Sequence, residues 1–302
     1  MTVFAETKRI ANALVNQVSQ IGMSKKEAKE KNLNVVRSLG TQRNYVDHVA
    51  AFLDHLQSLR QSVDGLFSSE QMQDYLYDLA DQPRPQKYIN TARQALQITF
   101  QLKLDHVESE VSTILTCRAY SEVDVSKVVS AQNSRNALST RLCYSANLRA
   151  HELLTIRRAD EIDRSAHRDW RPDLFVHLED FTIYTVTGKG GLTRYVPIPK
   201  NDAIELEKYR VPDNFEIIRR DRKIDHSIKY TIPGGQSFSQ SFSKTSKEVL
   251  GFSHGAHGLR HSYAQKRLAE LRAHGMDIEN AMEILSQELG HFRPDIVLDY
   301  LR

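Results

Sequence analysis

The chain has 302 residues, of which 40% are hydrophobic and 26% are charged, a composition typical of a globular protein with room for two domains. No apolar run approaches the roughly 20 residues that cross a bilayer, and the N-terminus lacks the charged-then-apolar pattern of an export signal. The net charge is only +3, and residues 1–117 carry equal numbers of basic and acidic side chains. A polybasic arm is therefore excluded, and any nucleic-acid contact must come from a local basic face.

The first hundred residues predict helices joined by short breaks. Apolar residues repeat at helical spacing over residues 4–18, and Thr41 is expected to cap a second helix. Ser68 or Ser69 is expected to cap a third helix, and residues 87–100 predict another. Four or five helices in this length predict a small bundle.

The second half of the chain shows a mixed pattern. Residues 139–144 and 152–156 predict helices around a turn at 146–149. The stretch LFVHLEDFTIYTVTGKGGLTRYVPIP predicts two or three β-strands with a hairpin turn at 187–191. Residues 210–236 give no assignment, and helices are expected at 262–272 and from the Asp277 cap to Gly290.

These patterns predict a mainly α-helical fold with a small antiparallel β-sheet, divided into two domains. We expect a helical domain over residues 1–105, a linker over 106–118 and an α+β domain over 119–302. The two cysteines, Cys117 and Cys143, show no metal-binding spacing, so we expect buried reduced thiols and no structural metal.

A basic and histidine-rich set of residues ends in a tyrosine near the C-terminus. Its members in chain order are Arg149, Lys189, His257, Arg260, His291 and Tyr300. Guanidiniums bind phosphate oxygens bidentately, and imidazoles and an ammonium supply protons, so this set suits attack on a phosphodiester by the phenol. Each of these residues alone is more often structural than catalytic, but their order, spacing and flanking residues together favour a catalytic set. The sequence shows no cluster of carboxylates beside them, so a two-metal mechanism is not expected.

The flanking residues of this set resemble the tyrosine recombinases, the phage-integrase family of site-specific DNA strand-transfer enzymes. The segments that carry the resemblance are YSANLRAHELLTIRRAD, VTGKGGLTRYVPIP, HGLR, and LGH followed nine residues later by Tyr. The resemblance covers about residues 120–300, whereas the helical part before it is similar to the family's core-DNA-binding domain only in pattern.

The resemblance implies a role for each member of the set. Tyr300 would attack a scissile phosphate and form a 3′-phosphotyrosyl intermediate with a free 5′-hydroxyl. Arg149 and Arg260 would neutralise the transition-state charge, and Lys189 would protonate the leaving oxygen.

The remaining roles are supporting ones. His257 and His291 would hydrogen-bond the phosphate or assist proton transfer from Tyr300, and Glu152 would orient Arg149. No cofactor is implied, because the covalent intermediate conserves the phosphodiester bond energy.

The resemblance also implies partners. These are duplex DNA with a specific core site, a homotetramer on synapsed DNA, a monomer or weak oligomer when free, and accessory DNA-bending or directionality proteins. We expect a cytoplasmic, nucleoid-associated protein of bacterial origin that does not bind membranes. Candidate DNA contacts are Arg43, Arg84, Lys87, Arg93 and Arg194.

Two departures from the family pattern stand out. Asn147 lies where glycine is common, and asparagine tolerates the left-handed backbone that such a position needs. Only Leu301 and Arg302 follow Tyr300, whereas the family commonly adds a tail helix, so we expect a mobile chain end and activation on assembly.

Two other classes of protein fit parts of this pattern. A type IB topoisomerase shares the chemistry but acts without site specificity, and the spacing from LGH to Tyr300 favours a recombinase over it. A catalytically inert DNA-binding regulator would need a lost catalytic residue, and all six positions are filled.

Overall fold

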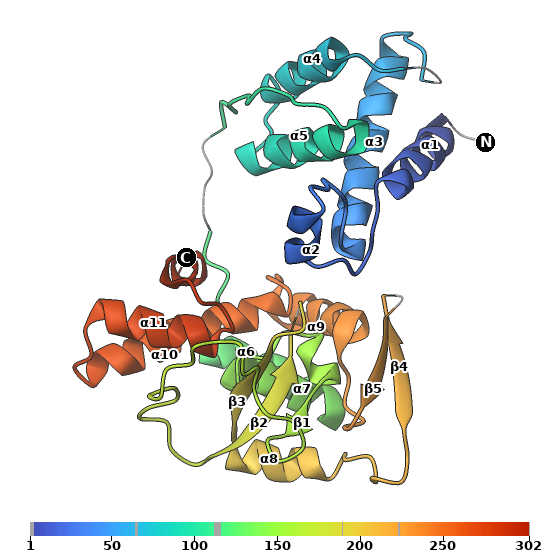
Figure 1. Ribbon diagram of the computed structural model, residues 1–302. Coiled ribbons are helices and arrows are strands. Elements are labelled where there is room, and N and C mark those ends of the chain that lie inside the picture. Colours follow the sequence, from blue (N-terminus) through green and yellow to red (C-terminus); the bar gives the residue numbers. More distant parts are fainter. Residues whose placement is uncertain (1–2, 64–65, 112–115, 189, 223, 302) are drawn as a thin grey trace. The chain divides into compact units, whose positions relative to one another are not determined.

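A computed structural model describes residues 3–63, 66–111, 116–188, 190–222 and 224–301. The chain divides into two compact units, Met1–Ile114 and Leu115–Arg302, which are described separately below (Figure 1). Across the described ranges, no helix combines the length and the apolarity that a bilayer crossing requires.

Unit 1 is a helical bundle with one apolar core. Its helices are α1 (Val3–Gln17), α2 (Lys25–Glu30), α3 (Leu39–Ser58), α4 (Ser69–Ala80) and α5 (Gln86–Phe100). The core gathers fully buried apolar side chains of α3, α4 and α5, among them Phe52, Met72 and Leu96. These side chains follow the helical spacing of the sequence, which is why the bundle forms as predicted.

The helix caps of unit 1 explain where its helices begin. The Ser68 hydroxyl accepts the Gln71 N–H at 3.1 Å while the Gln71 side chain accepts the Ser68 N–H, so α4 starts with a capping box as expected. The expected cap at Thr41 is wrong. Ser38 caps α3 instead, because its hydroxyl accepts the Thr41 N–H at 3.2 Å.

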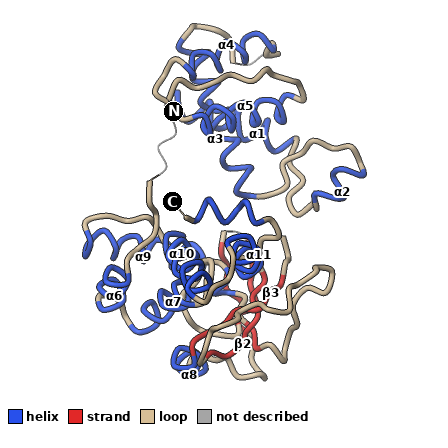
Figure 2. The backbone as a smooth tube through the Cα atoms, turned by 90° about the vertical axis from the view of Figure 1, so that its left-hand side faces the viewer, coloured by secondary structure: helices blue, strands red, loops and turns tan. Residues whose placement is uncertain are grey.

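Unit 2 is an α+β unit with a three-stranded antiparallel sheet of order β1-β2-β3 and a separate β4–β5 hairpin (Figures 1 and 2). Its strands are β1 (Arg157–Arg158), β2 (Phe181–Thr187), β3 (Thr193–Pro199), β4 (Ile217–Asp221) and β5 (Ile224–Ile228). Its helices are α6 (Glu122–Ser130), α7 (Ser134–Ser145), α8 (Lys200–Glu207), α9 (Gly235–Leu250), α10 (His257–Ala273) and α11 (Ile278–Glu288), with 3-10 turns η1 (Glu152–Leu154) and η2 (Pro294–Tyr300). The predicted fold class, mainly helical with a small antiparallel sheet, is confirmed.

Several elements of unit 2 differ from the sequence expectation. The unassigned region contains the β4–β5 hairpin and the start of α9, and α10 begins at His257 instead of Ser262. The start of α10 lacks a clear apolar stripe, because Leu259 is followed by two buried polar residues, Arg260 and His261. Cys143 is buried as expected, but Cys117 is exposed.

Candidate active site

The turn after α7 organises the candidate site through one residue with a left-handed backbone. Asn147 has φ +59°, as its position predicted. Its carbonyl accepts hydrogen bonds from Arg194 Nη2 at 2.9 Å and Arg260 Nη1 at 2.8 Å. Its side-chain amide donates to the Glu288 carbonyl at 2.9 Å, so this turn joins β3, α10 and the end of α11.

Glu152 is the fully buried carboxylate of the site. It accepts the backbone N–H of Arg149 at 2.8 Å and Arg149 Nη1 at 2.7 Å, and its other partner is Arg194 Nη2 at 2.8 Å. Burial alone would raise its pKa, but the charges of Arg194, Arg149 and Arg260 hold the pKa well below its usual range. The carboxylate therefore stays ionised and fixes two guanidiniums.

Arg194 does not have the role that the sequence suggested. It is only 2% exposed and pairs with Glu152 and the Asn147 carbonyl, so the expected DNA contact is wrong. The alternation of side chains along the strand could have indicated that Arg194 is buried. Arg194 shares one face of β3 with Val196 and Ile198, and all three side chains are buried.

Tyr300 lies in a hydrogen-bonded chain with three other candidate residues. Its hydroxyl is 3.2 Å from Arg260 Nε and 3.3 Å from His291 Nε2, and the same His291 nitrogen is 3.1 Å from Arg149 Nη2. An arginine only donates, so His291 Nε2 must accept. The Tyr300 hydroxyl then accepts from Arg260 and shares the single lone pair of His291 Nε2 with Arg149.

The expected mobility of the chain end is also wrong. Tyr300 is 6% exposed, and η2 packs through Val297 against Leu285 and Leu289 of the α11 segment. The Gln265 amide of α10 also donates to the Tyr300 carbonyl at 3.1 Å. Tyr300 is therefore packed on α10 and on the segment that ends α11.

Two histidines beside Tyr300 are held neutral. Burial, followed by the charge of Arg260, lowers the pKa of His257 to about 3 and that of His291 to about 4. The His257 ring centroid lies 5.8 Å from that of Tyr300, and the ring centroid of His261, which is 2% exposed, lies 5.0 Å from it. Of these two neutral imidazoles, that of His291 lies within hydrogen-bond distance of the Tyr300 hydroxyl, at 3.3 Å.

A cavity of about 300 Å³ opens beside this chain of residues, and Arg149, Glu152, Gly188 and His291 are among its lining. Gly188 leaves this space free, because a Cβ at that position would lie 3.0 Å from Glu152 Oε1. The predicted hairpin turn between β2 and β3 is confirmed, with Thr187 paired to Thr193. Lys189, the sixth candidate residue, lies outside the described residues.

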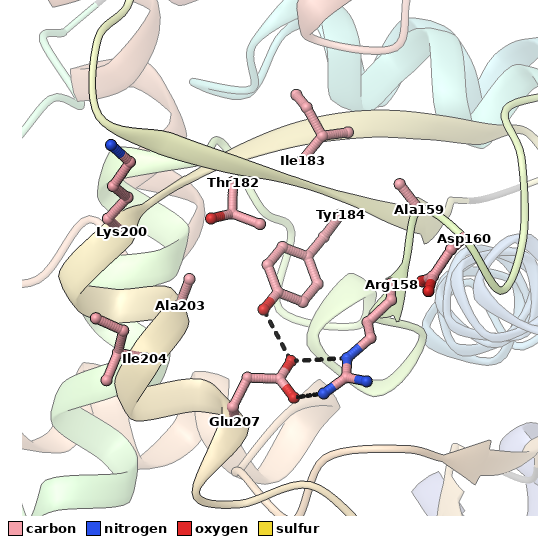
Figure 3. Close-up of a pocket in the computed structure, with 10 residues that line it drawn as sticks. All are labelled: Arg158, Ala159, Asp160, Thr182, Ile183, Tyr184, Lys200, Ala203, Ile204 and Glu207. Atoms are coloured by element: carbon pink, nitrogen blue, oxygen red, sulfur yellow. Dashed lines mark hydrogen bonds and ion pairs between the residues drawn. The ribbon is translucent and has the colours of Figure 1, made fainter.

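A larger cavity of about 660 Å³ lies elsewhere in unit 2 and contains none of the candidate residues (Figure 3). On one side of it, Glu207 accepts hydrogen bonds from the Tyr184 hydroxyl at 2.8 Å and from Arg158. These contacts join β1, β2 and the end of α8, so we assign the network a structural role.

The remaining candidate DNA contacts lie in unit 1. Arg43, Arg84 and Lys87 are exposed, whereas Arg93 is half-buried. The Arg84 guanidinium lies 4.9 Å from the Tyr88 ring centroid at the start of α5. No described His, Cys, Asp or Glu residues form a group of three or more that could hold a metal ion.

Comparison with solved structures defines the class of fold. XerH site-specific recombinase, bound to palindromic difH substrate in a post-cleavage complex, gives a TM-score of 0.54 at 15% identity and covers 98% of this chain and 90% of its own. A lambda integrase dimer bound to a COC′ core site also gives 0.54, at 14% identity, over 100% of this chain and 77% of its own. The fold is that of the tyrosine recombinases.

Sequence comparison leads to the same family. No protein-family model matches the sequence. Tyrosine recombinase XerA of Pyrococcus horikoshii is 30% identical over 217 residues, which are 67% of this chain. The match spans 65% of the length of XerA. The chain is therefore similar to the tyrosine recombinases in sequence over this match and in fold.

Proposed function

We propose that this chain is a site-specific recombinase that cuts and rejoins duplex DNA through a 3′-phosphotyrosyl intermediate. The observation that carries this proposal is the continuous hydrogen-bonded chain Arg149–His291–Tyr300–Arg260. The recombinase identity of XerA supports it at the level of sequence, and the DNA-bound XerH and lambda integrase share the fold.

In the first step, the Tyr300 oxygen attacks the phosphorus and the bond from phosphorus to the 5′-oxygen breaks. Neutral His291 Nε2, 3.3 Å from the hydroxyl, accepts the phenol proton. The hydrogen bond from Arg260 Nε stabilises the developing phenolate. Attack by a 5′-hydroxyl on the phosphotyrosyl bond reverses these changes and rejoins a strand, so no nucleotide cofactor is consumed.

Arg149 and Arg260 stabilise the charge on the phosphate in the transition state. Arg260 has five N–H donors and uses three of them on Asn147, Leu289 and Tyr300, which leaves two for phosphate oxygens. Arg149 is 21% exposed beside the cavity. Arg260 is fully buried, with its guanidinium 5.5 Å from the Tyr300 ring centroid, so it lies directly beside the proposed nucleophile.

The other proposed roles rest on the family resemblance and on position in the chain. Lys189 protonates the 5′-leaving oxygen, and its neighbour Gly188 lines the cavity. Glu152 orients Arg149, and His257 assists at the phosphate. Residues 119–302 form the catalytic domain, 106–118 the linker and 1–105 the core-DNA-binding domain.

The proposed partners follow from the same reaction. The substrate is duplex DNA with a specific core site, contacted by exposed cations such as Arg43, Arg84 and Lys87. A homotetramer brings two sites together, and accessory proteins bend the DNA or set directionality. The free protein is a monomer or weak oligomer.

Covalent trapping on nicked duplex DNA tests this function. Fragments flanking the source gene are incubated with wild type, Tyr300→Phe and Arg260→Ala, and adducts are separated on denaturing gels. We expect an adduct at one mapped position, its loss in Tyr300→Phe, and a loss of at least about a hundredfold in rate in Arg260→Ala. Binding without any adduct would favour an inert regulator, and adducts on every duplex would favour a type IB topoisomerase.

A further inference from the structure

The loop between β1 and β2 is fastened to the element that carries His291. The Arg171 N–H donates to Gln287 Oε1 of α11 at 2.9 Å, and the Gln287 amide donates to the Asp169 carbonyl at 3.3 Å. Arg171 also pairs with Glu283 of α11 at 2.5 Å. On the other side, Ser165 exchanges backbone and side-chain hydrogen bonds with Thr193 of β3. The loop is therefore held at both ends.

Aromatic rings and arginines gather between these two attachments. This aromatic–arginine cluster consists of Arg164, Arg168, Trp170, Tyr195 and Phe292. The Trp170 and Phe292 ring centroids are 4.8 Å apart in an edge-to-face contact, and Trp170 Nε1 donates to the Ser165 carbonyl at 2.9 Å. Phe292 directly follows His291, so the cluster borders the candidate active site.

The arginines of the cluster contact ring faces instead of carboxylates. The Arg164 guanidinium lies 5.6 Å from the Trp170 centroid and 5.2 Å from the Tyr195 centroid, and that of Arg168 lies 5.0 Å from Phe292. Neither forms an ion pair with any residue of the described ranges, whereas Arg171 nearby pairs with two carboxylates. The carboxylate of Asp163, next to Arg164, is already hydrogen-bonded by the Tyr195 hydroxyl.

A stacked guanidinium keeps its charge and most of its donors available. The ring holds the plane of the guanidinium while its N–H edges stay free for a planar, bidentate contact with phosphate. Arg168 and the neighbouring Arg293 are exposed, and Arg164 is half-buried. The arrangement suits a row of backbone phosphates, because neither guanidinium is engaged in an ion pair within the described residues and their N–H edges can meet phosphate oxygens.

We propose that this cluster is a second phosphate-binding subsite, at which Arg164 and Arg168 hold backbone phosphates of the DNA next to the one attacked by Tyr300. The proposal rests on the proposed function, since it requires duplex DNA as the substrate. Trp170 and Phe292 are positioning residues that set the two guanidiniums and couple the subsite to the turn that bears His291.

The test uses the full-length Tyr300→Phe protein, which separates binding from cleavage, and mixed-sequence duplex DNA as the probe. Trp170 is the single tryptophan of the chain, so its emission reports directly on the cluster. We expect duplex DNA to change this emission. We also expect the added pair Arg164→Gln and Arg168→Gln to weaken binding several-fold and to lower the slope of log affinity against log salt by about 1.8, at about 0.9 per phosphate contact.

Arg135→Gln is the matched control. Arg135 is also exposed and stacked, with its guanidinium 5.3 Å from the Tyr209 centroid just after α8, which lies on the opposite side of unit 2 from α11 (Figures 1 and 2). It should leave the salt slope and the Trp170 signal unchanged. Circular dichroism checks that every variant is folded.

An unchanged salt slope in the folded double variant, or Trp170 emission that saturating DNA does not alter, would overturn the subsite. If the subsite is overturned in this way but wild type still forms the covalent adduct, the proposed recombinase function stands without the subsite. If the Tyr300→Phe protein binds no duplex DNA at all, both the subsite and the proposed function fail.

Discussion

Asn147 fixes the positions of several other residues of the candidate site through its hydrogen bonds. Its left-handed backbone turns its carbonyl toward Arg194 and Arg260, and its amide reaches the Glu288 carbonyl. A glycine would adopt the same backbone but would lack this last bond. Asparagine therefore replaces the expected glycine and adds a link to the end of α11.

Glu152 should matter for stability as well as for orientation. Changing it to Gln leaves the half-buried guanidinium of Arg149 and the buried guanidiniums of Arg194 and Arg260 without this counter-charge, so we expect the free energy of unfolding to fall by about 3 kcal/mol or more at pH 7. Urea unfolding of the two proteins measures this difference.

The stability difference should depend on pH in a defined direction. The folded pKa of Glu152 is lowered, so the stabilisation is complete above the unfolded pKa of about 4.3 and is lost as the pH falls below it. The gap between wild type and Glu152→Gln should therefore narrow at about pH 3. A gap that stays constant or widens there would contradict the assigned ion pairs.

His291 should remain neutral in the free protein well below the pH at which histidines usually titrate. Burial and the charges of Arg260 and Arg149 lower its pKa to about 4, so an imidazole NMR titration should show no protonation near pH 6. In Arg149→Ala the pKa should rise toward about 6.5, because one repelling charge is removed. Titration of wild-type His291 near its usual value would contradict the assigned burial of this side chain beside Arg260 and Arg149.

At the scale of elements, the end of α11 decides where His291 lies. Glu288, the last residue of the helix, accepts hydrogen bonds from Arg267, Tyr263 and the Phe175 N–H, which fix α11 to α10 and to the loop before β2. Gly290 then turns the chain with φ +69°. The His291 N–H donates to the Ser286 carbonyl at 2.8 Å and completes the turn.

Gly290→Ala should therefore damage both stability and activity. The left-handed backbone costs about 1–2 kcal/mol with a side chain, and a Cβ would lie 2.9 Å from Arg194 Cδ. We expect a lower melting temperature and slower adduct formation in the trapping assay.

Gly275→Ala provides the matched control for this change. Gly275 has φ +84° after α10, but nothing lies within 4 Å of a Cβ there. It should show a similar loss of stability with an unchanged adduct rate. Equal effects of the two substitutions on the rate would show that the contact with Arg194 is unimportant.

At the scale of the whole molecule, each unit has its own apolar core. The bundle core lies in unit 1, and the main core of unit 2 lies between its sheet and helices. All five described candidate residues, from Arg149 to Tyr300, belong to unit 2. The described part of the candidate active site is therefore formed by unit 2 alone.

A fragment of residues 116–302 should consequently fold by itself. We expect a cooperative thermal transition and the same low pKa of His291, because the surrounding charges belong to the fragment. Its DNA affinity should be lower and its salt slope shallower than those of the full chain, since the phosphate contacts proposed for unit 1 would be lost. An unfolded fragment would show that the core of unit 2 is insufficient.

The sequence alone determined those features that depend on near neighbours in the chain. The caps at Ser68 and Asp277, the apolar stripe of the bundle helices and the turn at Asn147 each follow from residues only a few positions apart. The short motifs HGLR and LGH, with Tyr300 nine residues after His291, were visible for the same reason. All of these are local patterns.

Only the tertiary structure decided the rest. The sequence predicted Arg194 as an exposed cation, but in the structure it lies on the buried face of β3 and pairs with Glu152. The sequence predicted a mobile segment around Tyr300, but in the structure η2 packs against α10 and the α11 segment. The Arg260–Tyr300 bond joins residues 40 positions apart, and the Asn147–Arg260 bond joins residues 113 apart. Such contacts depend on how whole elements pack, because local propensity carries no information about partners that the chain brings together only when it folds.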